Sequence, residues 1–193
     1  MTDFTTQLRD DVYIAGLEQF CRELLRPGAT LVELGSFAGE STAVFARFAA
    51  RVYAIDPWDD SYSKTVVAGC ADPRIVEYLK DVPVPSMSEI EAIFDKRTGI
   101  FDNVVKIKDT AENALRRFPD RSVDVVYIDS IHTYRMVKRQ IAGWRGKVRP
   151  GGVLSGHDFA ADTWPGVVRA VEEMIGKPDH LYPDTSWAWR VRG

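Results

Sequence analysis

The sequence contains few cysteines and no excess of positive charge. Its two cysteines, Cys21 and Cys70, form no C-x-x-C pair, so a reducing compartment is the simplest expectation. The 28 acidic and 25 basic residues give a net charge of -3, whereas a nucleic-acid surface usually requires a basic domain. We therefore expect no nucleic-acid partner.

Long apolar runs are also missing. No run approaches the ~18 residues that span a bilayer. The first residues, 1–7, lack the charged and apolar regions of a secretory leader. We therefore expect no membrane partner and a cytoplasmic location. The length of 193 residues indicates a single domain, residues 1–193.

The chain is organised around residues 31–42. A short apolar run ends at Gly35, a turn of small residues follows, and helical spacing begins at Glu40. This order predicts a strand, a tight turn and a helix, with backbone N–H groups at the carboxyl end of the strand, where cofactors bind in parallel sheets. A second strand, 52–56, ends in Asp56, at the spacing of an acid that binds ribose hydroxyls.

The glycines of this turn limit which class of cofactor can bind there. A dinucleotide fingerprint needs glycine where Phe37 stands, and a Walker motif needs lysine where Glu40 stands. A nucleoside cofactor without phosphates remains, and a turn that only packs a helix on a strand is the structural alternative. Residues 33–41, Glu-Leu-Gly-Ser-Phe-Ala-Gly-Glu-Ser, resemble the first motif of class I S-adenosylmethionine-dependent methyltransferases, in the form common among small-molecule O-methyltransferases.

A second group of polar residues follows two later strands. Asp129 and Asp158 come at the carboxyl ends of successive strands, and neighbouring strands lie ~4.8 Å apart. Converging carboxylates repel unless they are protonated or share a cation, and with waters and a substrate oxygen they make a fair Mg²⁺ site. His132 and His157 add a nitrogen ligand or a base that titrates near neutral pH. The alternatives are that Asp129 caps the following turn and that the histidines only pack or orient ligands.

Three ordered segments, 128–134, 149–152 and 156–159, resemble a methyltransferase family with the motifs I-D-G-x-H-x-Y, R-P-G-G and H-D. This family includes relatives of the antibiotic sugar O-methyltransferases and, more distantly, catechol O-methyltransferase. The resemblance places metal ligation on Asp129, His157 and Asp158. Ser130 replaces the usual glycine and Ile131 stands where many relatives carry an acid, so a site without metal stays open.

The resemblance implies an α/β fold, with a doubly wound, mostly parallel sheet (the Rossmann-like methyltransferase fold) and an antiparallel terminal strand. The alternation of patterns agrees with this fold. We expect strands at 31–35, 52–56, 103–109, 123–129 and 153–159, and a turn at 149–152. We expect helices at 10–26, 40–48, 72–80, 86–96, 111–118, 134–144 and 165–175, and an edge hairpin within 180–192. The irregular segment 57–102 is expected to be a lid or substrate-binding insertion, with decoration or a homodimer contact as the alternative.

We therefore expect an S-adenosylmethionine-dependent methyltransferase that acts on a hydroxyl of a small molecule, assisted by Mg²⁺. The expected catalytic residues are His132, His157 and Asp129. The expected cofactor contacts are Glu33, Gly35, Ser36, Phe37, Gly39, Ser41, Asp56, Trp58, Asp109 and Asp129. Trp58 fits core packing nearly as well. Two other classes stay open: an NAD(P)-dependent oxidoreductase, and a non-catalytic protein that binds S-adenosylmethionine.

Overall fold

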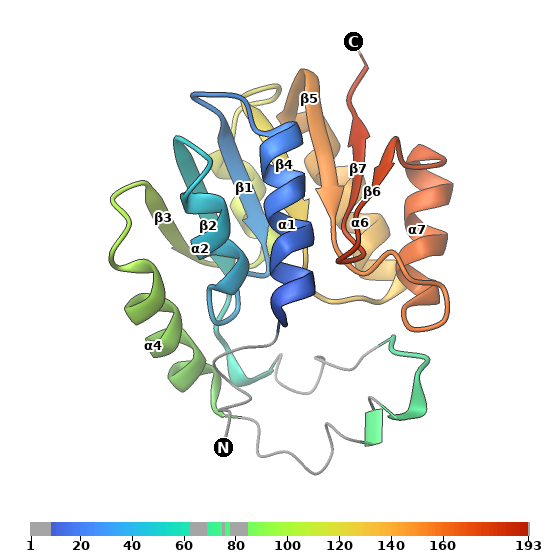
Figure 1. Cartoon of the computed structure of the whole chain (residues 1–193), viewed down its shortest axis with the longest axis horizontal. Helices are drawn as coiled ribbons and strands as arrows, with labels where there is room; N and C mark the ends of the chain where they lie inside the picture. Colours follow the sequence, from blue (N-terminus) through green and yellow to red (C-terminus); the bar gives the residue numbers. More distant parts are fainter. Residues whose placement is uncertain (1–8, 62–68, 75, 78–84, 193) are drawn as a thin grey trace.

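The computed structural model describes residues 9–61, 69–74, 76–77 and 85–192. Within them, seven strands form one sheet in the order β3-β2-β1-β4-β5-β7-β6 (Figure 1). The strands are β1 (Thr30–Leu34), β2 (Arg51–Asp56), β3 (Val104–Lys108), β4 (Val123–Ile128), β5 (Val148–Gly156), β6 (His180–Leu181) and β7 (Trp187–Arg190). β1 to β5 pair in parallel, and β7 runs antiparallel to both of its neighbours. The expected fold class is confirmed.

Helices cover both faces of this sheet. One layer holds α1 (Asp11–Leu24), α2 (Glu40–Ala46) and α4 (Met87–Thr98), and the other holds α5 (Ala111–Ala114), α6 (Tyr134–Trp144) and α7 (Pro165–Ile175). Successive strand residues point to opposite faces, so Leu31 packs with α1 and α2 while Val32 packs with α6 and α7. In Figure 1, α1 and α2 lie in front of the sheet and α6 lies behind it.

Local signals set where the helices begin. The side chains of Asp10 and Thr133 accept hydrogen bonds from the first turns of α1 and α6. Ser86 and Glu89 form a capping box at α4, and Pro165 opens α7. These side chains satisfy donors that a helix start leaves free, and proline loses nothing there.

The expected turn at 149–152 is wrong, because these residues lie inside β5. The pairing with β4 jumps from Val123–Val148 to Val125–Val153, so the segment between them bulges out and returns to the same strand. β5 then ends at Gly156, earlier than expected, although the N–H of His157 still donates to the carbonyl of Ile128 at 3.0 Å.

Three expected helices are shorter than predicted. α1 begins at Asp11 and ends at Leu24, whereas 10–26 was expected. α2 ends at Ala46. After α5, the chain continues as a 3₁₀ turn, η2 (Leu115–Arg117). Phe118 is already extended, because a residue before proline avoids the helical region. Of the helix expected at 72–80, residues 73, 74, 76 and 77 are helical, and residues 75 and 78–80 lie outside the described residues.

The terminal hairpin forms, but only β6 is at the edge; β7 lies between β5 and β6. Of the insertion at 57–102, α4 belongs to the helical layer, where Ile90 and Phe94 pack with Ala54 and Trp58. The expectation of a lid or substrate-binding segment therefore concerns only the residues between β2 and α4. Residues 62–68 and 78–84 of that segment lie outside the described residues. No helix of the described chain is long and apolar enough to cross a membrane.

Candidate active site

The turn between β1 and α2 requires glycine at two positions. Gly35 and Gly39 have φ of 89° and 81°, a region that side chains disfavour. A Cβ on Gly35 would lie 2.2 Å from the carbonyl oxygen of Asp129. Gly35 therefore lets the ends of β1 and β4 meet. Phe37, with φ of 42°, stands where a dinucleotide fold would approach a pyrophosphate.

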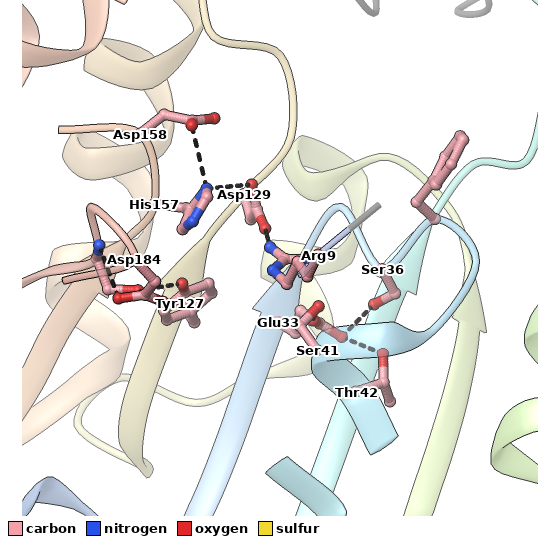
Figure 2. Close-up of polar contacts among 12 residues, drawn as sticks. Arg9, Glu33, Ser36, Ser41, Thr42, Tyr127, Asp129, His157, Asp158 and Asp184 are labelled. Atoms are coloured by element: carbon pink, nitrogen blue, oxygen red, sulfur yellow. Dashed lines mark hydrogen bonds and ion pairs between the residues drawn. The ribbon is translucent and has the colours of Figure 1, made fainter. Parts of the chain in front are cut away.

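A buried carboxylate braces this turn from inside. Glu33 is 0% exposed and accepts hydrogen bonds from Ser36 Oγ at 2.7 Å and from the hydroxyls of Ser41 and Thr42 (Figure 2). Burial raises the pKa of Glu33 to about 7, although the three hydroxyl contacts oppose the rise. Glu33, Ser36 and Ser41, which we expected to contact the cofactor, thus hold one another and fix the shape of the turn.

Asp56 joins the end of β2 to the same turn. Its carboxylate accepts the N–H of Phe37 at 3.0 Å and the N–H of Trp58 at 2.9 Å. Burial raises its pKa, and these two hydrogen bonds oppose the rise. The indole of Trp58 is 3% exposed, donates to the carbonyl of Phe37 at 2.9 Å and packs against Phe94 with ring centroids 4.8 Å apart. Trp58 therefore has the packing role that we kept as its alternative.

Asp109 lies further out, after the edge strand β3. Its backbone N–H donates to the carbonyl of Asp56 at 3.1 Å, and its carboxylate accepts from the N–H of Thr110 at 2.9 Å. The side chain is 25% exposed. Asp109 thus lies beside the end of β2, next to Asp56, and its side chain is partly open to solvent.

The two aspartates and two histidines of the second group meet at the carboxyl ends of β4 and β5. Nε2 of His132 lies 2.7 Å from Oδ2 of Asp158 and 3.4 Å from Oδ1 of Asp129. Nδ1 of His157 lies 3.1 Å from Oδ1 of Asp158 and 3.8 Å from Oδ1 of Asp129. Asp158 has φ of 62°, a strained conformation that aims its carboxylate at both histidines. These four residues form the Asp–His cluster.

Opposite charges set the protonation of the Asp–His cluster. Burial alone would lower the pKa of His132, but hydrogen bonds to Asp129 and Asp158 raise it to about 10. The pKa of His157 is also raised, since the charges of Asp129 and Asp158 outweigh burial. Burial would raise the pKa of Asp129, yet Arg9 and His157 lower it to about 2. Without ligands, the carboxylates are thus ionised and His132 is an imidazolium at neutral pH.

Sequence reasoning missed Arg9. Its guanidinium forms an ion pair with Asp129, and the two side chains are 12% and 10% exposed. Figure 2 shows Arg9 between Asp129 and Glu33. A single arginine before the first helix belongs to no motif, so nothing in the sequence marks it as part of the site.

A separate buried network supports β4 beneath the site. The hydroxyl of Tyr127 lies 2.6 Å from Oγ of Ser186, which donates to Oδ2 of Asp184 at 2.7 Å. Tyr127, Asp184 and Ser186 are all 0% exposed. Their contacts tie β4 to the turn between β6 and β7, and so fix the strand that presents Asp129.

The Asp–His cluster includes a group that could bind a metal. One ligand atom from each of Asp129, His132 and Asp158 lies within 4.8 Å of the other two. The sequence predicted His157 as the nitrogen ligand, whereas this group contains His132. Two carboxylates and an imidazole suit Mg²⁺ through the oxygens and transition metals through the full set. The side chains present therefore fit a divalent cation.

Residues 69–71 of the insertion lie against the loops that carry the Asp–His cluster. The N–H of Ala71 donates to the carbonyl of Thr163, after β5, at 2.7 Å. A Cβ on Gly69 would lie 2.8 Å from the carbonyl oxygen of His132, after β4. Residues 69–71 thus flank the site.

The fold and this edge of the sheet define a class I, Rossmann-like methyltransferase. Residues 32–159 match the family described as a methyltransferase domain, and the chain belongs to this family. The matched range contains Asp56, the whole Asp–His cluster and the turn between β1 and α2 (residues 35–39), which we call the cofactor turn. No curated protein matches the sequence.

Solved structures agree on the fold. The chain is similar to cofactor-bound Rv0187 from MTB, with 16% identity, a TM-score of 0.57, and 98% of this chain and 94% of that chain covered. It is similar to a SAM-dependent O-methyltransferase from Thermotoga maritima, with 13% identity, a TM-score of 0.56, and 87% and 51% covered. An rRNA methylase from Streptococcus thermophilus matches with 14% identity, a TM-score of 0.55, and 91% and 84% covered. The chain spans only 28% to 49% of three further matched structures.

Proposed function

We propose that this protein transfers the methyl group of S-adenosylmethionine to a hydroxyl of a small molecule. The observation that carries this proposal is the Asp–His cluster, which lies directly beside the cofactor turn because Gly35 contacts the backbone of Asp129. The cluster offers carboxylates and imidazoles that can align a hydroxyl and take its proton.

The cofactor turn fits a nucleoside cofactor without phosphates. Phe37 occupies the place that a pyrophosphate would need, and Asp56 stands at the end of β2, where it would bind the ribose hydroxyls. The backbone of Gly35 and Gly39 would face the methionine part. When bound, the cofactor supplies a methyl group on a positively charged sulfur. Family membership favours methyl transfer over the NAD(P)-dependent alternative.

We propose His132 as the base. Its Nε2 is held by Asp158 and Asp129, and its Nδ1 is buried without a hydrogen-bond partner in the described chain. A proton can therefore be taken at Nδ1 while Nε2–H is donated to Asp158, an effect of about 10² to 10⁴ in rate. The imidazole must first become neutral. The positive sulfur of the cofactor, or a bound divalent cation, would lower the pKa of His132 and so favour the neutral form.

Divalent metal assistance is part of the same proposal. Asp129 and Asp158 would hold Mg²⁺ through their carboxylate oxygens, and His132 would remain the base. The metal would polarise the acceptor hydroxyl. Ile131 offers no oxygen where many relatives carry an acid, which keeps metal-free transfer as the alternative.

The acceptor is proposed to bind between the Asp–His cluster and residues 69–71. The matched structures include proteins named as rRNA methylases and as an O-methyltransferase, so their names do not choose the substrate. The net charge of -3 supports a small molecule over RNA.

The test combines binding with turnover. Calorimetric titration with S-adenosylmethionine, S-adenosylhomocysteine and NAD, each with and without Mg²⁺, should show binding of the first two alone. Methyl-labelled S-adenosylmethionine is then offered with phenols, sugars, aliphatic alcohols and ribosomal RNA, and products are identified by mass spectrometry. Label on a small-molecule oxygen is the expected result. Label on RNA, or binding of NAD alone, would contradict the proposal.

A matched pair of variants tests whether the Asp–His cluster is needed for methyl transfer. Asp158→Asn should abolish transfer and spare S-adenosylhomocysteine binding. Asp162→Asn, on the exposed part of the same loop, should change neither. Tight product binding by the wild type without turnover on any acceptor would favour a non-catalytic binding protein.

A further inference from the structure

Arg9 enters the site from outside the methyltransferase motifs. It precedes α1 and reaches the carboxyl ends of β1 and β4, where its charge interacts with Asp129 and Glu33. The side chain is 12% exposed, so the guanidinium is largely removed from water. Leaving a buried arginine without a partner is strongly destabilising, and the ion pair with Asp129 prevents that here.

This ion pair leaves hydrogen-bonding capacity unused. Nε of Arg9 is buried and has no acceptor among the described residues. A guanidinium binds a carboxylate best through two parallel N–H groups. Asp129 cannot give its whole carboxylate to Arg9, because its Oδ1 faces His132 at 3.4 Å and His157 at 3.8 Å. Arg9 therefore has a donor left for a second carboxylate.

We propose that the amino-acid end of the cofactor inserts into the Arg9–Asp129 ion pair. Its carboxylate would bind the guanidinium of Arg9, and its ammonium group would replace Arg9 at Oδ2 of Asp129. Oδ1 of Asp129 would stay directed at the two histidines. A zwitterion provides one partner for each charge, so both buried ions exchange partners and neither is left unpaired. This inference rests on the proposed function, and it adds a cofactor-binding residue that lies outside the motif region.

The exchange also changes the Asp–His cluster. Without cofactor, Arg9 holds one oxygen of Asp129; with cofactor, the ammonium group takes that place and Arg9 moves to the new carboxylate. The cofactor-free ion pair thus keeps Asp129 oriented toward the position that the cofactor will occupy.

The test uses two ligands that differ only in their amino-acid end. S-adenosylhomocysteine carries the zwitterion, and 5′-methylthioadenosine keeps the adenosine and sulfur but lacks it. Binding of each to the wild type and to Arg9→Met is measured by calorimetry. Arg9→Met should weaken S-adenosylhomocysteine by about 10- to 100-fold, the range of a lost charged hydrogen bond, and should leave 5′-methylthioadenosine unchanged.

Two further variants separate charge from structure. Arg9→Lys keeps the charge and should restore part of the S-adenosylhomocysteine affinity. Arg22→Met removes an arginine of α1 whose ion pair with Glu18 is exposed, and it should alter neither ligand. Retained 5′-methylthioadenosine binding shows that Arg9→Met still folds.

The outcomes distinguish the two levels of inference. If the wild type binds neither ligand, the proposed function fails. If the wild type binds S-adenosylhomocysteine and Arg9→Met binds it equally well, the inserted zwitterion is wrong while the proposed function stands. If Arg9→Met lowers the affinity for both ligands equally, the inserted zwitterion is also wrong, because Arg9 would then only support the fold.

Discussion

At the residue scale, the protonation of Glu33 affects stability as well as the cofactor turn. The pKa of this carboxyl is raised from its ordinary 4.5 to about 7 by burial. Between these values the folded protein keeps a proton that the unfolded chain has lost, so this group's contribution to stability falls as pH rises from about 4.5 to 7 and is constant above.

Replacing Glu33 with glutamine should therefore remove this part of the pH dependence. The amide stays neutral and can still meet Ser36, Ser41 and Thr42. Relative to the wild type, Glu33→Gln should gain on the order of 1–3 kcal/mol at pH 8 and nothing at pH 4.5. Urea unfolding at both pH values measures the difference. An equal effect at both values would mean that the carboxyl of Glu33 does not titrate in this window.

Asp56 gives a second prediction at this scale. Because its carboxylate holds the backbone of Phe37 and Trp58, Asp56→Ala should both weaken S-adenosylhomocysteine binding and lower stability by about 1–3 kcal/mol. Asp56→Asn keeps an acceptor oxygen, so it should preserve more of the stability than of the binding. Calorimetry and thermal unfolding of both variants check this. Unchanged binding in Asp56→Ala would remove the ribose assignment.

Much of the candidate site at the carboxyl edge of the sheet could be predicted from the sequence. Asp129, Asp158, His132 and His157 could be predicted to converge, because strand ends of a parallel sheet meet there. Arg9 could not, since only the packing of α1 against β1 and β4 brings it to the site. The role of Glu33 in bracing the turn could not be predicted either, because it depends on the hydroxyls of Ser36, Ser41 and Thr42, which only the folded chain brings to its carboxylate.

At the element scale, α4 should depend on its capping box. Ser86 accepts the N–H of Glu89, and the carboxylate of Glu89 returns to the N–H of Ser86 at 2.9 Å. Ser86→Ala should cost about 1 kcal/mol of stability without weakening S-adenosylhomocysteine binding. Lys96→Ala, on the exposed face of the same helix, is the control and should be nearly neutral. Denaturant unfolding measures both, and equal losses would contradict the capping role.

The elements differ in how well the sequence determines them. Buried strands such as β4 and the amphipathic helices α6 and α7 follow from periodicity. The bulge within β5 could not be predicted, because Pro150-Gly151-Gly152 is also a typical turn sequence and only pairing with β4 returns the chain to the strand. α4 could be predicted as a helix but not as part of the layer, which depends on contact with Trp58.

At the scale of the whole molecule, the cofactor should stabilise the native state. S-adenosylhomocysteine at 100 times its dissociation constant should add about 2.7 kcal/mol, which is about 5–10 °C in Tm for a chain of this length. NAD at the same concentration should add nothing. Differential scanning fluorimetry measures both. A shift with NAD alone would contradict the methyltransferase proposal.

The alternating strand and helix patterns predicted a mostly parallel, doubly wound sheet, and the structure confirms it. The position of β7 between β5 and β6 needed the family resemblance, because a hairpin pattern alone also fits an edge. The role of residues 69–71 needed the structure, since no periodicity indicates what an irregular segment contacts.

Gly35 has a practical consequence for mutational scans of this protein. Any side chain there meets the carbonyl oxygen of Asp129 at 2.2 Å and Cα of Ser130 at 2.6 Å, so even alanine must push β1 and β4 apart. An inactive Gly35 variant would then look like a damaged Asp129 variant. A scan that scores only activity would assign the loss at Gly35 to the cofactor turn. Part of that loss would come from the displacement of Asp129, on the acceptor side of the site.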